Sequence, residues 1–143
     1  MGFAVVDVKV TILDGSYHEV DSTEFAFQAA GRLGALSALN AAGPALKEPI
    51  MSVEVVTPEA HMGDVMSDVS TRRGRIAGLE TSADGMRIVR AQVPLAEMFE
   101  YSTSLRSMTQ GRAFYTMEPL RYETAPPEVT EKMTARGHGR MAV

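Results

Sequence analysis

The stretch Pro94–Met117, PLAEMFEYSTSLRSMTQGRAFYTM, decides how the second half of the chain folds. Pro94 suits the first position of a helix, where its missing N–H would have no partner. An inward apolar face is predicted from residues at helical spacing: Leu95, Met98, Phe99, Leu105 and Met108. Gly111 permits the chain to leave the helix, and aromatic residues after Arg112 predict a strand. We therefore expect a short helical start, a helix, and a strand that closes a sheet beneath that helix.

The segment before this stretch supplies the start of the sheet. Apolar and polar residues alternate over residues 51–55, which predicts a first strand. Thr57, Pro58 and Glu59 then fit an N-cap, a first helical proline and a carboxylate that the helix dipole favours. The inner face of the following helix is predicted from i, i+3, i+4, i+7 spacing: Met62, Val65, Met66 and Val69. Gly74 then releases the chain.

Two further strands complete this unit. Ile76–Thr81 and Met86–Val93 are rich in β-compatible residues, and Ser82–Gly85 between them is typical of a turn. The element order is therefore βαββαβ. That order predicts a ferredoxin-like sandwich, in which an antiparallel sheet carries both helices on one face, and the fold class is α+β.

The N-terminal residues predict a smaller unit with one strand and one helix. Val6, Val8, Val10 and Ile12 alternate with polar residues, as in a half-buried strand. A polar loop, SYHEVD, follows over residues 16–21. Its last residue is expected to cap a helix with Glu24 in a capping box. The apolar face of that helix comprises Phe25, Ala29, Leu33, Leu36 and Leu39, and Gly43-Pro44 ends it.

One strand and one helix cannot close a core, so the first unit lacks partners. The sequence therefore looks truncated at its start, with the missing strands in a longer protein or in a second copy. We expect an incomplete βα unit over residues 1–47 and the ferredoxin-like domain over 48–124. Residues 125–143 would be a linker, one or two helical turns within Glu128–Thr134, and a frayed tail from Ala135.

Composition limits the function classes. The chain has 143 residues, 45% of them hydrophobic, which is enough for one ordinary domain or two small ones. A net charge of −4 excludes a histone-like mode, so nucleic-acid contact would need a local arginine cluster. No cysteine, signal peptide or membrane-length apolar run is present, and we expect a cytoplasmic chain with no membrane contact.

Catalytic and metal-binding patterns are not found. The sequence has no phosphate-binding GxxxxGK[ST] loop and no GxSxG element. His18, His61 and His138 lie far apart, without the spacing of metal ligands. We therefore expect no catalytic residue and no metal site. The Met62–Val69 face is assigned to the core and His61 to the helix surface.

Two clusters could bind RNA. Tyr17 and His18, at the tip of a loop that also holds Ser16 and Glu19, could stack on or hydrogen-bond to nucleotides. The alternative is an ordinary polar loop, which the residues alone favour. The second cluster could form a basic edge against phosphates: Arg72, Arg73 and Arg75, with Arg87 and Arg90 on a neighbouring strand. Alternatively, the arginines that follow the helix only balance its dipole, and those on the strand are ordinary solvated charges. The residues alone do not decide between these two interpretations.

Three long stretches resemble one protein family in order along the chain. They are DVKVTILDGSYHEVDSTEFAFQAAG, LKEPIMSVEVVTPEAHMGDVMSDVSTRRGRIAGLE and VRAQVPLAEMFEYSTSLRSMTQGRAFYTMEP. They resemble the C-terminal part of bacterial elongation factor G, the translational GTPase that drives ribosomal translocation. By this resemblance residues 5–47 match the second half of domain IV, part of a ribosomal-protein-S5-like domain. Residues 48–123 match domain V.

The resemblance implies a role at the ribosome. Domain IV of the family reaches the decoding site and helps hold tRNA and mRNA in register, with the loop matching SYHEVD at its tip. His18 matches the tip histidine, which outweighs the ordinary-loop interpretation. Domain V lies against large-subunit rRNA, which favours phosphate contacts for Arg72, Arg73 and Arg75. The implied partners are the ribosome, its tRNA and mRNA, and the remaining domains of the parent factor.

Departures from the family limit what this chain can do alone. The GTPase domain is missing, so GTP and magnesium would belong to the absent part and the chain would not be an enzyme. Glu100, Ser102 and Ser104 stand where the family more often has glycine, alanine and aspartate. Two rival interpretations are a stand-alone ferredoxin-like regulatory module that dimerises through its orphan strand, and a small phosphatase-like enzyme.

Overall fold

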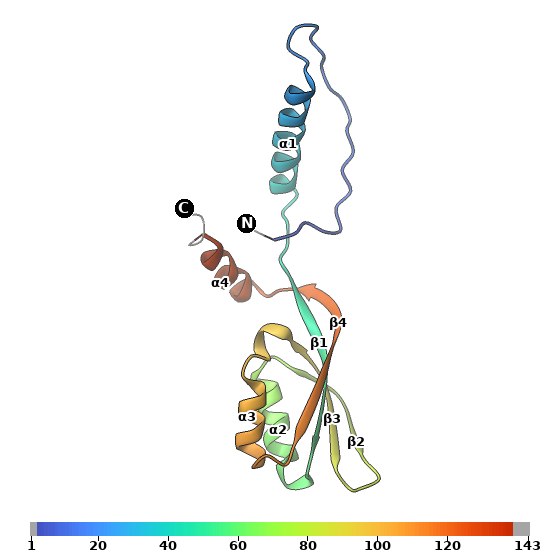
Figure 1. Ribbon diagram of the computed structural model, residues 1–143, viewed down its shortest axis with the longest axis vertical. Helices are drawn as coiled ribbons and strands as arrows, with labels where there is room; N and C mark the ends of the chain where they lie inside the picture. The colour runs from blue at the N-terminus through green and yellow to red at the C-terminus, as the bar shows by residue number, and fades with distance from the viewer. Residues whose placement is uncertain (1–2, 139–143) are drawn as a thin grey trace. The chain divides into compact units, whose positions relative to one another are not determined.

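The computed structural model describes residues 3–138, whose path is drawn in Figure 1. Contacts divide them into two units. One holds the described residues up to Leu46 and from Pro126 onward, and the other is Lys47–Ala125. In chain order the elements are α1 (Glu24–Ala41), β1 (Lys47–Thr57), α2 (Glu59–Thr71), β2 (Arg75–Thr81), β3 (Arg87–Pro94), the 3-10 turn η1 (Leu95–Glu97), α3 (Tyr101–Thr109), β4 (Phe114–Thr124) and α4 (Pro127–His138).

The second unit is built on a four-stranded antiparallel sheet in the order β2-β3-β1-β4. β1 lies in the centre, where Val53 faces Ala91 of β3 and Met117 of β4. Helices α2 and α3 cover the same face of the sheet (Figure 1). The predicted α+β class and the ferredoxin-like βαββαβ order are therefore confirmed.

The core of this unit lies between the sheet and the two helices. Strand residues of one parity contribute Val53 and Val55 from β1 and Val89 and Val93 from β3, all almost fully buried. The helices add Val65 and Val69 of the predicted α2 stripe and Leu105 of the predicted α3 stripe. Tyr101 of α3 is also buried, although the spacing did not predict it. The alternation and helical spacing seen in the sequence therefore identified most of the core.

Two predicted helix beginnings are wrong in detail. Thr57 does not cap α2, because it remains paired with Arg87 in the sheet and its side chain is buried. Pro58 takes the N-cap position without a side-chain bond. Pro94 is likewise still a strand residue, paired with Ile50, and the 3-10 turn begins one residue later. In both cases strand pairing continues further than the local sequence indicates.

Phe99 was predicted to face inward, but its side chain is 74% exposed. The helical stretch is interrupted between η1 and α3, where Glu100 adopts a left-handed φ of 61°. Leu95, Met98 and Phe99 therefore do not share one continuous helical face. Met98 is buried as predicted.

The predicted N-terminal strand is absent from the described residues 3–23, which form no sheet pairing. The segment is extended, and its aliphatic side chains face solvent: Val10 is 68% and Ile12 is 89% exposed. Apolar and polar residues do alternate here, as in a strand. A strand forms, however, only when a neighbouring strand pairs with its backbone hydrogen-bonding groups. Within the described residues, the alternating stretch therefore joins no sheet.

Helix α1 begins at a different cap from the one predicted. Thr23, not Asp21, is the N-cap residue, and its Oγ1 accepts a hydrogen bond from Ala26 N at 3.2 Å. Asp21 instead accepts the Thr23 N–H at its backbone carbonyl. The helix ends at Ala41, just before Gly43 with φ 67°, as the Gly-Pro signal predicted.

The predicted inner face of α1 is not buried. No residue of α1 is buried, and Phe25 and Leu33 are 80% and 67% exposed. The described part of this unit contains no sheet against which the stripe could be buried. At the other end of the chain, α4 reaches His138 and is longer than the one or two turns expected. The frayed tail predicted from Ala135 is wrong for residues 135–138, which belong to α4, and the rest of that tail lies outside the described residues.

Candidate nucleic-acid interface

The tip loop connects the extended N-terminal segment to α1, and two hydrogen bonds close it. The His18 backbone N–H donates to Ser22 Oγ at 2.6 Å, and the Ser22 N–H donates back to the His18 carbonyl at 3.0 Å. Before it, the Gly15 N–H donates to Asp14 Oδ1 at 2.7 Å. These short-range bonds fix the loop backbone without using the side chains of Tyr17 and His18.

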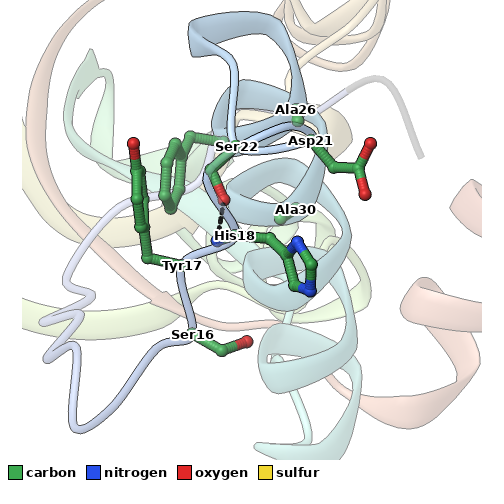
Figure 2. A pocket seen from close by; sticks show the side chains of 8 residues that line it. Ser16, Tyr17, His18, Asp21, Ser22, Ala26 and Ala30 are labelled. Atoms are coloured by element: carbon green, nitrogen blue, oxygen red, sulfur yellow. Dashed lines mark hydrogen bonds between the residues drawn. The ribbon is translucent and has the colours of Figure 1, made fainter.

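All four predicted tip residues, Ser16 to Glu19, are exposed. The Tyr17 side chain is 69% exposed. In Figure 2 the Tyr17 and His18 side chains extend to different sides of the loop. An aromatic face and an imidazole that both reach solvent can stack on a base and exchange hydrogen bonds with it.

A shallow pocket lies between this loop and the first turns of α1, with a volume of about 200 Å³ (Figure 2). Its lining is Ser16, Tyr17, His18, Asp21, Ser22, Ala26, Phe27 and Ala30. Sequence reasoning found the loop residues but missed the helix residues that form the floor. It also missed Ser22, which holds the loop closed. The cluster Asp-Ser-Thr before a helix was the available signal, because such residues bond to nearby backbone.

Arg72 is not a free cation at the end of α2. Its guanidinium donates to Asp68 Oδ2 at 2.8 Å, to the Glu97 carbonyl at 2.7 Å and to Ser104 Oγ at 2.9 Å. It also lies over the Tyr101 ring, 5.0 Å from the centroid. Its side chain is only 18% exposed. Arg72 therefore joins α2 to the η1–α3 segment.

Arg73 is similarly occupied. It forms ion pairs with Glu48 and Glu97, and its Nη1 donates to Glu48 Oε2 at 3.2 Å. The hydrogen bond to Glu48 is the main reason why the pKa of Arg73 is raised, and burial acts in the opposite direction. The pair connects the turn after α2 to the start of β1.

Arg75 is the most accessible of the three predicted phosphate ligands, with a side chain 63% exposed. Its Nη2 donates to both carboxylate oxygens of Glu123, at 2.8 and 2.7 Å. Arg121 shares the same carboxylate, and its hydrogen bond is the largest cause of the lowered pKa of Glu123. A phosphate could reach Arg75 only in competition with this carboxylate.

Arg87 and Arg90 also have carboxylate partners. Arg87 Nη2 donates to Glu59 at 2.7 Å, and Arg90 Nε donates to Glu54 at 3.0 Å. Arg90 lies opposite Glu54 across the β1–β3 pairing, so its charge is balanced within the sheet face. The five arginines therefore carry intramolecular partners, and the structure does not bring them together as one uncompensated patch.

The sequence analysis did not predict a further contact of a basic residue, which joins Arg112 to His61 of α2. Arg112 Nη2 lies 3.1 Å from His61 Nε2 and 3.2 Å from Gln110 Oε1. These residues come from α2 and from the turn after α3, which the separation in sequence did not reveal.

Across residues 3–138 no cluster of three histidine or acidic residues is arranged to hold a metal ion. Within the same residues, no helix has both the length and the apolar character needed to span a bilayer.

Comparison with known proteins assigns both units. The model "Elongation factor G, domain IV" matches residues 1–43, and "Elongation factor G C-terminus" matches residues 45–133. A crystal structure of a protein from Thermus thermophilus superimposes with a TM-score of 0.73 at 41% sequence identity. The match covers 86% of this chain but only 18% of the Thermus chain. The predicted resemblance is therefore confirmed, and the chain belongs to the elongation factor G family, matching part of domain IV and the C-terminal domain.

Proposed function

We propose that this chain is the ribosome-contacting C-terminal part of an elongation factor G-like protein that promotes GTP-dependent translocation of tRNA and mRNA. The observation that carries the proposal is the exposed tip loop, which hydrogen bonds between His18 and Ser22 close within a segment that matches domain IV. A loop closed by its own hydrogen bonds, with the Tyr17 and His18 side chains exposed, suits transient contacts to the tRNA–mRNA pair at the decoding site. The cytoplasm is the compartment that this role requires.

The chain acts in this proposal as a binding element and not as the GTPase. Its matches are to domain IV and the C-terminus, and GTP and magnesium would be bound by another part of the parent factor. Of the three arginines predicted to contact rRNA, Arg75 is the most exposed and so the best placed to meet phosphate, in competition with Glu123. The remaining domains of the parent factor are further partners.

Co-sedimentation with purified ribosomes tests the proposal. The chain should pellet with ribosomes at low salt and compete with intact elongation factor G. Affinity should fall by roughly one power of salt concentration for each phosphate contact. His18→Ala and Tyr17→Ala should weaken binding, whereas Gln28→Ala, an exposed polar residue on α1, should not. A folded chain that neither pellets nor competes at low salt contradicts the proposal.

The second candidate is a regulatory module that self-associates through its N-terminal segment. The exposed aliphatic residues of this segment favour it, since an unpaired alternating stretch readily pairs with another copy. Size-exclusion chromatography with light scattering separates the two: a tight dimer without affinity for ribosomes would replace the first proposal.

A further inference from the structure

The chain passes between its two units twice, and both crossings leave the sheet at the same place. The unit boundaries put one crossing just before Lys47 and the other just after Ala125. Lys47 is the first residue of β1 and pairs with Thr124, the last residue of β4. Both connections between the units therefore start from one pair of neighbouring strands.

These strand ends form a two-stranded ribbon, residues 47–49 of β1 and 122–124 of β4. The pairing of β1 with β3 begins only at Ile50, opposite Pro94, so among the described residues the ribbon strands pair only with each other. Figure 1 shows β1 and β4 running side by side to this end of the sheet. A ribbon of two strands is marginally stable in water by itself, so other contacts must hold it.

Two carboxylates oppose each other in the ribbon. Glu48 pairs with Glu123 in the register of β1 and β4. Like charges at directly opposed positions destabilise a strand pair. Glu48 is also only 7% exposed, and a carboxylate so far from water requires a charged partner. The ribbon therefore depends on cations from elsewhere in the chain.

The segment after α2 supplies one arginine to each carboxylate. Arg73 Nη1 donates to Glu48 Oε2 at 3.2 Å and to Glu97 Oε1 at 3.4 Å. Arg75 Nη2 donates to both carboxylate oxygens of Glu123, at 2.8 and 2.7 Å. Two arginines that are two positions apart thus neutralise the two opposed carboxylates of the ribbon.

The backbone between these two arginines is closely packed. The Gly74 N–H donates to the Val69 carbonyl at 2.9 Å, and a Cβ on this glycine would lie 3.0 Å from Val93 Cγ2. The segment is therefore in close contact with the end of α2 and with the core residues of β3, and it has little room to shift. The arginines extend to the ribbon from a fixed backbone.

The Glu123 side of the ribbon has a further connection to the sheet. Arg121 Nε donates to Glu123 at 2.7 Å, and Arg121 Nη2 donates to Gln92 of β3 at 2.8 Å. Arg75 belongs to β2. Glu123 is therefore linked to β2 and β3, the two strands with which the ribbon does not pair.

We propose that Arg73 and Arg75 form a clamp that sets the direction in which the ribbon, and with it both connections between the units, leaves the sheet. The clamp needs no ribosomal partner, so the inference goes beyond the proposed function. Its two halves differ in exposure. The side chains of Arg73 and Glu48 are 32% and 9% exposed, whereas those of Arg75 and Glu123 are 63% and 32% exposed. The Arg75 half is therefore the one that opens in water while the sheet stays folded.

Amide hydrogen exchange of the full chain tests the clamp. Arg75→Gln should raise exchange at the ribbon amides at least threefold, while the amides of Val53 and Val55 in the middle of β1 change less than twofold. Arg90→Gln is the matched control, because Arg90 pairs with Glu54 in the middle of the same sheet. Both variants should melt close to the parent chain, since both ion pairs are exposed. An unchanged ribbon in Arg75→Gln, or an equal response to both variants, overturns the inference.

A distance measurement shows whether the ribbon changes direction. The chain has no cysteine, so spin labels can be attached after Ala45→Cys, just before the ribbon, and Ser67→Cys on α2, both at exposed positions. Arg75→Gln should broaden the distribution of distances between the labels, and Arg90→Gln should leave its width unchanged. Equal widths in the parent and in both variants would show that the clamp does not set the direction of the ribbon, and would overturn the inference.

Discussion

Glu100 occupies a backbone conformation that suits glycine, with φ 61° at the N-terminal end of α3. Its side chain makes no capping bond to the helix. We expect Glu100→Gly to raise the free energy of unfolding by about 0.5–1 kcal/mol, because relief of strain exceeds the added entropy of the unfolded chain. Urea unfolding measures the change. Gln110→Gly, at φ 55°, is a matched variant at the other end of α3, and a lower midpoint for Glu100→Gly would contradict the argument.

Gly74 is required for close packing between α2 and the sheet. A Cβ atom there would lie 2.6 Å from the Val69 carbonyl oxygen and 3.0 Å from Val93 Cγ2. We expect Gly74→Ala to destabilise the chain by about 1–3 kcal/mol through overpacking. Gly63→Ala is the control, because a Cβ in the middle of α2 meets nothing within 4 Å. That variant should be more stable by up to about 1 kcal/mol, and thermal melts of the pair check both signs.

Tyr101 links stability to alkaline pH. Burial raises its pKa to about 12, and the charge of Asp68 adds to this while Arg72 opposes it. Between about pH 10 and 12 the unfolded chain loses the phenolic proton but the folded chain keeps it. The stabilisation is therefore complete below pH 10 and falls as pH rises, by about 3 kcal/mol in total. Urea unfolding across this range measures it.

Tyr101→Phe is the matched variant for that titration. The buried hydroxyl has no hydrogen-bond partner among the described residues, so its removal at neutral pH should be close to neutral or slightly stabilising. Between about pH 10 and 12, the free energy of unfolding of Tyr101→Phe should therefore fall less than that of the parent chain. An identical pH dependence in both chains would show that Tyr101 does not carry it.

At the scale of elements, the arginines after α2 divide into a structural and an accessible member. Arg72 bonds α2 to η1 and α3, whereas Arg75 pairs with Glu123 at the surface. Arg72→Ala should cost about 2–4 kcal/mol because it leaves several partly buried acceptors without this donor, and Arg75→Ala should cost less than about 1 kcal/mol. Chemical denaturation measures both. If the two costs are equal, Arg72 does not hold the helices together.

Predictions from local sequence patterns were correct for the helices and strands that pack against another element of the described chain. They were wrong for those that do not. The stripe of α2 and the alternation of β1 and β3 were correct because each faces another element of the same sheet-and-helix unit. The same kinds of pattern in residues 5–13 and in α1 gave no strand and no buried face. Periodicity states which side chains would be buried together, but the partner that buries them need not be nearby.

Prediction of the candidate nucleic-acid interface from the sequence was limited in the same way. The exposure of Tyr17 and His18 followed from a polar loop between two elements, and that much was predictable. The ion pairs of Arg73 with Glu48 and of Arg75 with Glu123 join residues 25 and 48 positions apart. Local patterns identified the arginines but not their carboxylate partners, because those are set by strand order and register. Phosphate contact by these arginines stays a prediction.

At the scale of the whole molecule, the two units should differ strongly in local stability. Lys47–Ala125 has a continuous core, whereas α1 has no buried residue. Most of the stability of a helix in a protein comes from the packing of its apolar face, and α1 lacks that packing among the described residues. Amide hydrogen exchange should therefore be slow at Val53, Val55 and Val89 and close to unprotected along α1. Protection of α1 equal to that of the central strands would mean that the helix is buried in solution, for example in a dimer.

The lack of buried residues in α1 affects how the tip loop can bind. If the tip binds RNA as proposed, part of the favourable free energy of each contact would be used to order α1, the helix that supports the loop. Under the proposed function this favours weak binding and fast dissociation of the tip, which repeated rounds of translocation require. If α1 is stabilised by packing against an added protein domain, the tip should dissociate more slowly.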